Sequence, residues 1–240
     1  MIKRAADLKV ATAATQLSRL SIDVTHKASF LKCVMTLVRK VPKYWIAAST
    51  HHPEELSCGR IHIDLRQRFP GLLTLIAPRH PQRSVEIAST LRALSLNVRS
   101  LSRGEFPLPD TDILLIDTVG DLPLVYAISA GIPTFIGGSL FHGRGHNVAE
   151  ATLAGCSVIT GAHHLTFEPF LHRLNADNIL CRVVKSEEEL LHLVLQQFSD
   201  PDQTCRIGVL AAERTRTLSA DTIDLLWNDL SSAFSEVRSA

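Results

Sequence analysis

The segment from Gly137 to Thr160 constrains the fold more than any other part of the chain. The apolar residues 132–136 lead into a glycine-rich turn, and a polar segment, a run of small residues and a second apolar run follow. This order and length are typical of a strand–helix–strand unit with parallel strands. The turn would present backbone N–H groups beside a helix N-terminus, where anions are stabilised. The segment therefore predicts a parallel sheet with a candidate anion site at its edge.

The same alternation of short apolar runs and helical patterns continues through the chain. Several of the apolar runs are apolar on both faces, as interior strands of a parallel sheet are. The pattern predicts strands at residues 44–48, 72–77, 96–101, 113–117, 134–137, 157–160 and 179–184, and helices at 27–40, 53–68, 82–94, 122–130, 147–154 and 167–174. The predicted fold class is α/β, a Rossmann-like parallel sheet with helices on both faces.

Two further helices are expected near the C-terminus. Ser186 and Glu189 form a capping box ahead of an apolar run. The last helix carries an apolar stripe at helical spacing, which we expect to pack in the core: Ile223, Leu226, Trp227, Leu230 and Phe234. We expect residues 44–240 to form one domain, preceded by a lead-in and first helix over residues 1–43.

Charge and cysteine content exclude some classes of function. The net charge is +1, which argues against non-specific binding of nucleic acid. The five cysteines are scattered without Cys-x-x-Cys spacing, so neither a structural zinc site nor a disulfide framework is expected, and a reducing compartment is favoured. No apolar run reaches the ~18 residues of a membrane span. Residues 1–20 are basic and fit either a starting helix or inter-domain strand, or an amphipathic transit peptide.

In an open parallel sheet, ligands bind beyond the carboxyl ends of the strands, so the residues that follow each strand are candidates. Arg79, after the second expected strand, has a donor fork suited to phosphate or carboxylate. After the fourth strand, Gly120 permits a close turn and Asp121 is either a helix cap or a ligand contact. After the fifth, Asn147 and Glu150 lie on one face of a first helical turn.

Histidines also gather in these loops. His51 and His52 are adjacent, and neighbouring side chains diverge too far to chelate one metal easily. His142 and His146 are four residues apart, but the glycines between them disfavour a helix that would carry a zinc pair. We therefore favour a flexible loop that closes on an anionic ligand.

Taken together, these loops offer donors for phosphate, a carboxylate for ribose and backbone groups for a base, which suits a nucleotide sugar. A Rossmann dehydrogenase would show Gly-x-Gly-x-x-Gly after the first strand, and residues 44–60 do not.

The motifs resemble those of 3-deoxy-D-manno-octulosonic acid (Kdo) transferases, which transfer Kdo from CMP-Kdo to lipid A precursors. The matching stretches fall in order at residues 45–55 (WIAASTHHPEE), 78–80 (PRH), 117–122 (DTVGDL), 137–150 (GGSLFHGRGHNVAE) and 161–167 (GAHHLTF). Such enzymes are GT-B glycosyltransferases with two Rossmann-like domains. This chain resembles the C-terminal, donor-binding domain without the acceptor domain, which in the family holds the membrane contact and a catalytic glutamate.

The resemblance implies roles for particular residues. Lys9, in the segment Asp7-Leu8-Lys9, would stabilise the transition state. The donor-binding residues would be Pro78, Arg79, Val119, Gly120, Asp121, Asn147, Val148, Ala149 and Glu150, with Arg79 near the phosphate and Glu150 on the ribose. Neither a metal nor another cofactor is implied. The chain departs from the family at Asp121, Ala151 and Thr166, where glutamate, proline and asparagine are usual, and its lead-in lacks a glycine before Asp7.

The implied partners are CMP-Kdo, a lipid A precursor as acceptor in the full enzyme, and a membrane surface reached through the other domain. The implied location is the cytoplasmic face of the bacterial inner membrane, or the mitochondrion if the source is a plant. Two alternatives stay open: a GT-B transferase that uses another nucleotide sugar, and a non-catalytic module that binds a nucleotide or a partner. We expect this chain alone to bind CMP but to transfer Kdo poorly or not at all.

Overall fold

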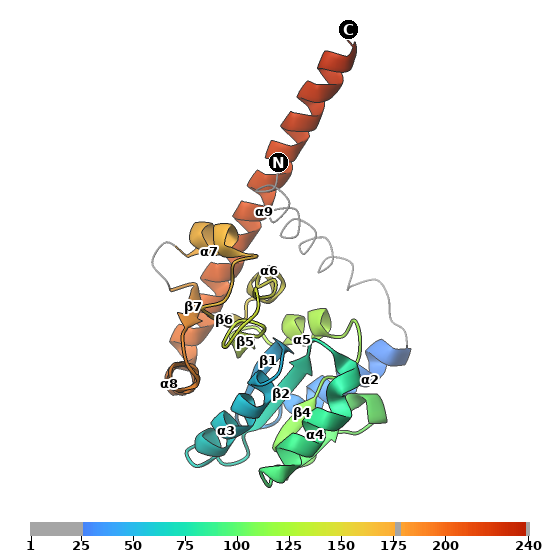
Figure 1. Ribbon diagram of the computed structural model, residues 1–240, viewed down its shortest axis with the longest axis vertical. Coiled ribbons are helices and arrows are strands. Elements are labelled where there is room, and N and C mark those ends of the chain that lie inside the picture. The colour runs from blue at the N-terminus through green and yellow to red at the C-terminus, as the bar shows by residue number, and fades with distance from the viewer. Residues whose placement is uncertain (1–25, 176–178, 239–240) are drawn as a thin grey trace.

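The computed structural model describes residues 26–175 and 179–238 and shows a seven-stranded sheet covered by helices on both faces (Figure 1). All neighbouring strands run parallel, in the order β3-β4-β2-β1-β5-β6-β7. The strands are β1 Tyr44–Thr50, β2 Leu73–Pro78, β3 Val98–Ser100, β4 Ile113–Leu115, β5 Pro133–Ile136, β6 Ser157–Gly161 and β7 Cys181–Val184. The seven expected strands and the α/β class are confirmed, with shifted ends.

Strands β3 and β4 are shorter than the sequence predicts, and Asp117 explains why. Its carboxylate accepts hydrogen bonds from the Ser100 and Ser102 hydroxyls at 2.7 and 2.6 Å and from the Ser102 N–H at 2.9 Å. These bonds tie the ends of both strands together and turn residues 101–103 into a short 3-10 helix, η2. The backbone therefore leaves extended geometry at the carboxyl ends of β3 and β4.

Helices of very different length alternate with the strands and cover both faces of the sheet. They are α2 His26–Val38, α3 Glu54–Arg66, α4 Ser84–Ala93, α5 Leu122–Ile128, α6 Ala149–Leu153, α7 Glu168–Leu174, α8 Glu187–Ser199 and α9 Pro201–Arg238, with the 3-10 turn η1 Pro81–Arg83 before α4. The expected capping box is confirmed at α8, where the Glu189 N–H donates to the Ser186 hydroxyl at 3.2 Å.

Strand β1 shows how the two faces are filled. Its alternate side chains point to opposite sides, so Ile46 joins one buried apolar cluster and Trp45 joins the other. The first cluster lies between the sheet and helices α2, α5, α6, α7 and α9, and the second lies between the sheet and α3, α4 and α8. Burial on both faces explains why the strands read as continuous apolar runs.

The C-terminal helix α9 runs past the edge of the sheet and projects beyond it (Figure 1). Of the apolar stripe expected to pack in the core, only Ile223 has a described side chain, and it is 49% exposed. The core expectation is therefore wrong at Ile223, because the helix has by then passed the sheet. The other four side chains lie outside the part whose side chains are described.

The order of strands creates a switch point between β1 and β5. From β1 the chain first builds the half with β2, β4 and β3, then returns to the other side of β1 to build β5, β6 and β7. Loops on the two sides of such a point diverge and leave a crevice at the carboxyl ends. Here the Gly137 N–H still bonds the Ala48 carbonyl at 2.8 Å, so the crevice opens just beyond these residues.

Lys9 and the basic segment 1–20 lie outside the described residues, so the roles expected for them stay predictions. Within residues 26–175 and 179–238, no helix is both long and apolar enough to cross a membrane.

Candidate functional site

A small cavity of about 160 Å³ opens at the carboxyl ends of β1, β2 and β4. We call it the Arg79 cavity. Its lining brings together four of the predicted site residues, Pro78, Arg79, Val119 and Gly120, with Ser49 at the end of β1. Residues 40 positions apart in sequence thus meet because parallel strands end at one edge.

Two features shape this cavity from the β1 and β2 sides. Ser49 has a left-handed backbone, with φ at 55°, at a bulge where the register of β1 against β2 shifts. Such a conformation costs a side-chain-bearing residue about 1 kcal/mol and is common at binding sites. The Arg79 N–H bonds the Thr50 carbonyl at 3.0 Å, which fixes the backbone and leaves the exposed side chain beside the cavity. The Arg79 guanidinium makes no hydrogen bond or ion pair with the described residues, so it can bind an incoming anion.

The loop after β4 forms the opposite wall. Gly120 has φ at +88°, a conformation that favours glycine, and the Val119 side chain is 79% exposed. Asp121 is buried, and its carboxylate accepts a hydrogen bond from the Thr118 hydroxyl without capping α5. Asp121 is not among the residues that line the cavity. In this arrangement its carboxylate shapes the turn instead of facing the open space.

The glycine-rich loop after β5 differs from what the sequence predicts. Its N–H groups are not bare, because Gly138, Ser139 and Leu140 donate hydrogen bonds of 2.7, 3.0 and 2.9 Å to the Glu54 carboxylate. The His51 N–H donates to the same carboxylate at 2.9 Å. Glu54 is 1% exposed, so this internal anion occupies the position that the sequence assigned to a ligand. The expectation that bare backbone N–H groups bind a ligand anion is therefore wrong for residues 138–140.

The close approach of Glu54 also explains a glycine in the motif. A Cβ atom on Gly137 would lie 2.5 Å from a Glu54 carboxylate oxygen and 2.8 Å from the Thr50 Cα. No side chain fits there. Glycine is needed at position 137 because the loop there packs against the first turn of α3, across the switch point.

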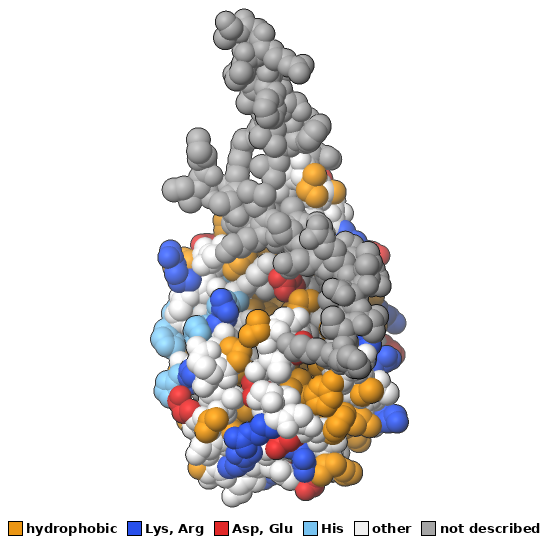
Figure 2. All heavy atoms as spheres, turned by 90° about the vertical axis from the view of Figure 1, so that its right-hand side faces the viewer, with side chains coloured by type: hydrophobic (Ala, Val, Ile, Leu, Met, Phe, Trp, Pro, Cys, Tyr) orange, Lys and Arg blue, Asp and Glu red, His pale blue; other side chains and the backbone are white. Residues whose placement is uncertain are grey.

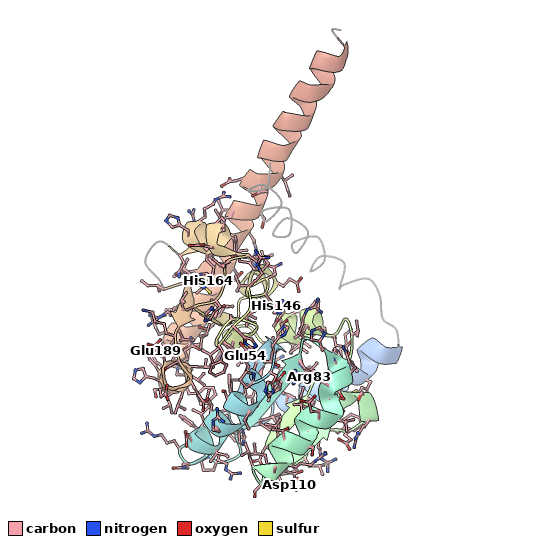
Figure 3. All side chains as sticks on the ribbon, in the orientation of Figure 1. Glu54, Arg83, Asp110, His146, His164 and Glu189 are labelled. Carbon is pink, nitrogen blue, oxygen red and sulfur yellow. The ribbon has the colours of Figure 1, made fainter. Side chains whose placement is uncertain are left out.

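The neighbouring acid, Glu55, makes a second buried link. Its carboxylate is 3.1 Å from the Arg83 guanidinium and 3.2 Å from the Thr50 hydroxyl. Burial acts to lower the pKa of Arg83, but the charges of Glu55 and Glu86 raise it overall. Glu54, Arg83 and His146 come from helix α3, the turn η1 and the glycine-rich loop, and Figure 3 shows them near one another around the carboxyl ends of β1 and β2. The first turn of α3 thus holds the loops on both sides of the switch point.

The predicted residues at the start of α6 form a separate group. The Asn147 side chain accepts a hydrogen bond of 2.9 Å from the Ala149 N–H, so it shapes the beginning of the helix. Val148 and Ala149 are buried at 1% and 0% exposure, so their side chains pack in the core. Any contact of these two residues with a ligand would have to come from the backbone.

Glu150 is the member of this group with a reactive side chain. It is half-buried, and burial raises the pKa of its carboxyl. Its carboxylate makes no hydrogen bond or ion pair with the described residues. Glu150 does not line either of the two cavities on this rim. The structure therefore brings Arg79 and Gly120 into one cavity and leaves Glu150 outside it, in the first turn of α6.

A second cavity of about 200 Å³ lies on the β5 side of the β1 loop, and we call it the histidine cavity. Its lining residues are His51, Gly138, His142, Gly143, Arg144, Gly145 and His146. The Nε2 atoms of His51 and His146 are 2.8 Å apart, and the two rings are stacked with their centroids 5.0 Å apart. Burial lowers the pKa of His51, against the opposing effect of Glu54. Figure 2 shows histidine side chains gathered on one flank of the molecule.

The histidine pairs expected from the sequence are thus rearranged by the fold. His51 meets His146, a residue 95 positions away, instead of its neighbour His52. In the described part of the chain, no group of three or more histidine, cysteine or acidic side chains is placed to hold a metal ion.

The sequence reasoning missed Glu54 and His146 as residues that shape the site. By sequence, Glu54 is one of two acids at the start of the helix expected at residues 53–68, where a negative charge is favourable, and His146 is half of a disfavoured zinc pair. A usable signal for Glu54 was present: two consecutive acids followed the first buried strand, at the edge where ligands bind. Nothing in the sequence indicated which distant loop would contact them.

The chain is similar in sequence to several known proteins. No family model matches the chain. The 3-deoxy-D-manno-octulosonic acid transferase of Haemophilus influenzae is 37% identical over 139 residues, covering 58% of this chain and 32% of that protein. A probable mitochondrial enzyme of the same name from Arabidopsis thaliana is 36% identical over 163 residues, covering 67% of this chain and 36% of that protein. That of Bordetella pertussis is 43% identical over 105 residues, covering 43% of this chain and 24% of that protein.

The chain is a homologue of Kdo transferases. It spans about a third of the length of the first two of these relatives.

Solved structures agree with the sequence relatives. The crystal structure of the C-terminal CMP-Kdo binding domain of WaaA from Acinetobacter baumannii has a TM-score of 0.70 at 25% identity, covering 78% of this chain and 97% of that domain. Trehalose-6-phosphate from E. coli bound with UDP-2-fluoro glucose has a TM-score of 0.55 at 9% identity, covering 91% of this chain and 49% of that chain, which shows the fold alone. The expected resemblance to Kdo transferases and the GT-B type of fold are confirmed.

Proposed function

We propose that this chain is the donor-binding part of a Kdo transferase and holds the cytidine monophosphate portion of CMP-Kdo at the carboxyl rim of its sheet. The observation that carries the proposal is the likeness to a CMP-Kdo binding domain over 97% of that domain's length. The Arg79 cavity supports it independently, since it offers a guanidinium without a hydrogen-bond or ion-pair partner among the described residues, beside a glycine turn at the position where such folds bind ligands.

In this proposal, Arg79 binds the phosphate and Glu150 accepts hydrogen bonds from the ribose hydroxyls. Val119 and Gly120 let the base approach the turn after β4, while Asp121 and Asn147 shape the two loops through the contacts that they make. Pro78 lines the same cavity, and Val148 and Ala149 contribute backbone only, because their side chains are buried. A phosphate held by Arg79 is the leaving group, so this residue would also stabilise charge that develops during transfer.

The full reaction needs groups that we assign to a second, acceptor-binding domain. An acceptor hydroxyl attacks the anomeric carbon of Kdo, the bond to the CMP phosphate breaks, and a general base removes the hydroxyl proton. We propose a lipid A precursor as the acceptor and a membrane surface as its source. Lys9 would add positive charge near the phosphate. The proposal requires no metal and no further cofactor.

Calorimetric titration with CMP tests the donor assignment. The wild-type chain should bind CMP more tightly than UMP or GMP. Arg79→Ala and Glu150→Ala should each weaken CMP binding by about 10- to 150-fold, the loss of a hydrogen bond to a charged group. Arg68→Ala is the matched control, because Arg68 is exposed at the far end of α3. Failure of the wild-type chain to bind CMP would overturn the proposal, and tighter binding of UMP or GMP would point to another nucleotide sugar.

A radiolabelled transfer assay tests the division between the two domains. We expect the chain alone to transfer Kdo slowly or not at all, and transfer to appear when a Kdo transferase acceptor domain is supplied. Rapid transfer by the chain alone would contradict this division. CMP binding without transfer in either condition would favour a non-catalytic nucleotide-binding module.

The relatives include bacterial proteins and a probable mitochondrial one. We propose that the chain works at a membrane surface, on the cytoplasmic face of the inner membrane if its source is bacterial and in the mitochondrion if its source is a plant. Fractionation of cells that express the tagged full-length protein checks this, and a fully soluble protein would contradict it.

A further inference from the structure

The histidine cavity has no role in the proposed binding of CMP, yet it adjoins the Arg79 cavity. Ser49 lines one cavity and His51 lines the other, so the two openings flank a single loop on the rim. Arg79 is also close enough to His51 for its charge to act on that imidazole. A ligand bound in the Arg79 cavity could therefore extend a second group toward the histidines.

The lining of the histidine cavity is suited to an anion. It contains three imidazoles and one guanidinium, from His51, His142, His146 and Arg144, and no acidic side chain. Arg144 and His142 are exposed. Arg144 makes no side-chain hydrogen bond or ion pair with the described residues, which leaves its donor fork available for a carboxylate or a phosphate.

The N–H groups of Gly138, Ser139 and Leu140 cannot serve this purpose, since Glu54 already accepts their hydrogen bonds. The positive charge that would attract an anion here comes from a side chain. The Glu54 charge lies beneath the cavity, but it is 1% exposed and accepts four N–H groups, which stabilise that charge locally. Arg144 then supplies the charge that faces the opening.

We propose that the histidine cavity binds the carboxylate of the donor sugar, with Arg144 as its charged ligand and His142 as a hydrogen-bond donor. This inference rests on the proposed function, because CMP-Kdo carries two anionic groups, the phosphate and the carboxylate next to the anomeric carbon. Two neighbouring cavities with cationic linings match two anions on one ligand. The His51–His146 contact holds the two rings at the junction between the cavities.

The test compares two ligands, CMP and CMP-Kdo, on the same variants by calorimetry. Arg144→Ala should weaken the binding of CMP-Kdo by about 10-fold or more and leave that of CMP unchanged. His142→Ala should act in the same direction with a smaller effect, and Arg68→Ala should change neither. CMP-N-acetylneuraminate, whose sugar carries a carboxylate at the same position, serves as a second anionic probe.

The outcomes distinguish failure of the carboxylate site from failure of CMP binding. If Arg144→Ala weakens CMP and CMP-Kdo equally, or neither, the carboxylate site is overturned while CMP binding stands. If the wild-type chain binds neither ligand, both proposals fail together. Because Arg144 and His142 are exposed, both variants should fold, which circular dichroism checks.

Discussion

The Arg79 cavity and the glycine-rich loop lie on opposite sides of the end of β1, and their donors are used differently. At Arg79 the guanidinium is exposed and has no partner among the described residues. In the loop, the backbone donors Gly138, Ser139 and Leu140 all bind the buried carboxylate of Glu54. A glycine-rich segment between a strand and a helix is therefore not in itself an anion site. The protein's own carboxylate can take that place and use it to join two halves of a sheet.

Glu54→Ala tests most directly whether the buried carboxylate holds the glycine-rich loop. Removing the carboxylate leaves three buried N–H groups and one partly buried N–H group without this partner, and we expect the free energy of unfolding to fall by about 3 kcal/mol or more. Urea denaturation measures the change. Glu86→Ala is the control, because Glu86 is exposed and its ion pair with Arg83 should contribute less than about 1 kcal/mol. Equal effects of the two substitutions would show that Glu54 does not hold the loop.

Two glycine substitutions compare the loops directly. Gly120→Ala, at φ +88° with nothing within 4 Å of the added Cβ, should cost about 1–2 kcal/mol from backbone strain alone. Gly138→Ala adds a contact of 2.8 Å with the His146 ring to similar strain, so it should cost about 1 kcal/mol more. Urea denaturation gives the stabilities, and the histidine resonances in NMR should shift only in the Gly138 variant. Identical losses would mean that the histidine ring moves freely aside.

Two histidines with lowered pKa values should make stability depend on pH: His51 on the rim and His62, which packs against the body of the sheet. Burial lowers the pKa of His62, whose ring contacts Thr74 and Asp112, with Arg66 nearby, and burial also lowers the pKa of His51, which faces Glu54, Glu55, His80 and Arg79. Because the unfolded chain then binds protons more readily than the folded chain, stability should be full above the unfolded pKa of about 6.5 and fall below it.

We expect the free energy of unfolding to fall between pH 7 and 5.5 because His62 is harder to protonate in the folded chain, measured by urea denaturation at several pH values. His62→Gln should remove most of this dependence and leave the part that belongs to the rim. A stability that rises as the pH falls through this range would contradict the assigned direction.

The smallest expected effect is at Ser49. Ser49→Gly relieves the left-handed backbone but gives the unfolded chain more freedom, so the net change should be below about 1 kcal/mol. The same substitution should leave CMP binding within about twofold if Ser49 contributes only backbone to the Arg79 cavity. Differential scanning calorimetry and a CMP titration measure the two quantities. A large loss of stability would indicate that the serine hydroxyl has a contact of its own.

Much of the fold could be predicted because buried segments have a recognisable local pattern of apolar residues. All seven strands were recognisable as apolar runs, since a parallel sheet buries both faces, and the Ser186 capping box marked the start of α8. Edge elements were less predictable. The end of β3 depends on hydrogen bonds from Ser100 and Ser102 to Asp117, which no single-residue preference encodes. The exposed Ile223 shows the same limit, because helical spacing does not say where a helix leaves the core.

The candidate site was only partly predictable for a related reason. Arg79 and Gly120 could be assigned to one rim, because the carboxyl ends of parallel strands meet at one edge, and the structure places both in one cavity. The Asn147 side chain accepts a hydrogen bond from the Ala149 N–H at the start of α6. Glu150 lies outside that cavity, in the first turn of α6.

The sequence by itself determined the class of fold, the edge at which a ligand would bind and the resemblance to Kdo transferases, because these depend on period, order and motif along the chain. Tertiary structure decided which polar groups remain available on that edge. Glu54 and the loop at Gly138 are 84 positions apart, and His51 and His146 are 95 apart. Only the return of the chain to the far side of β1 brings them within hydrogen-bonding distance, and hydrogen bonds act over about 3 Å regardless of separation in sequence.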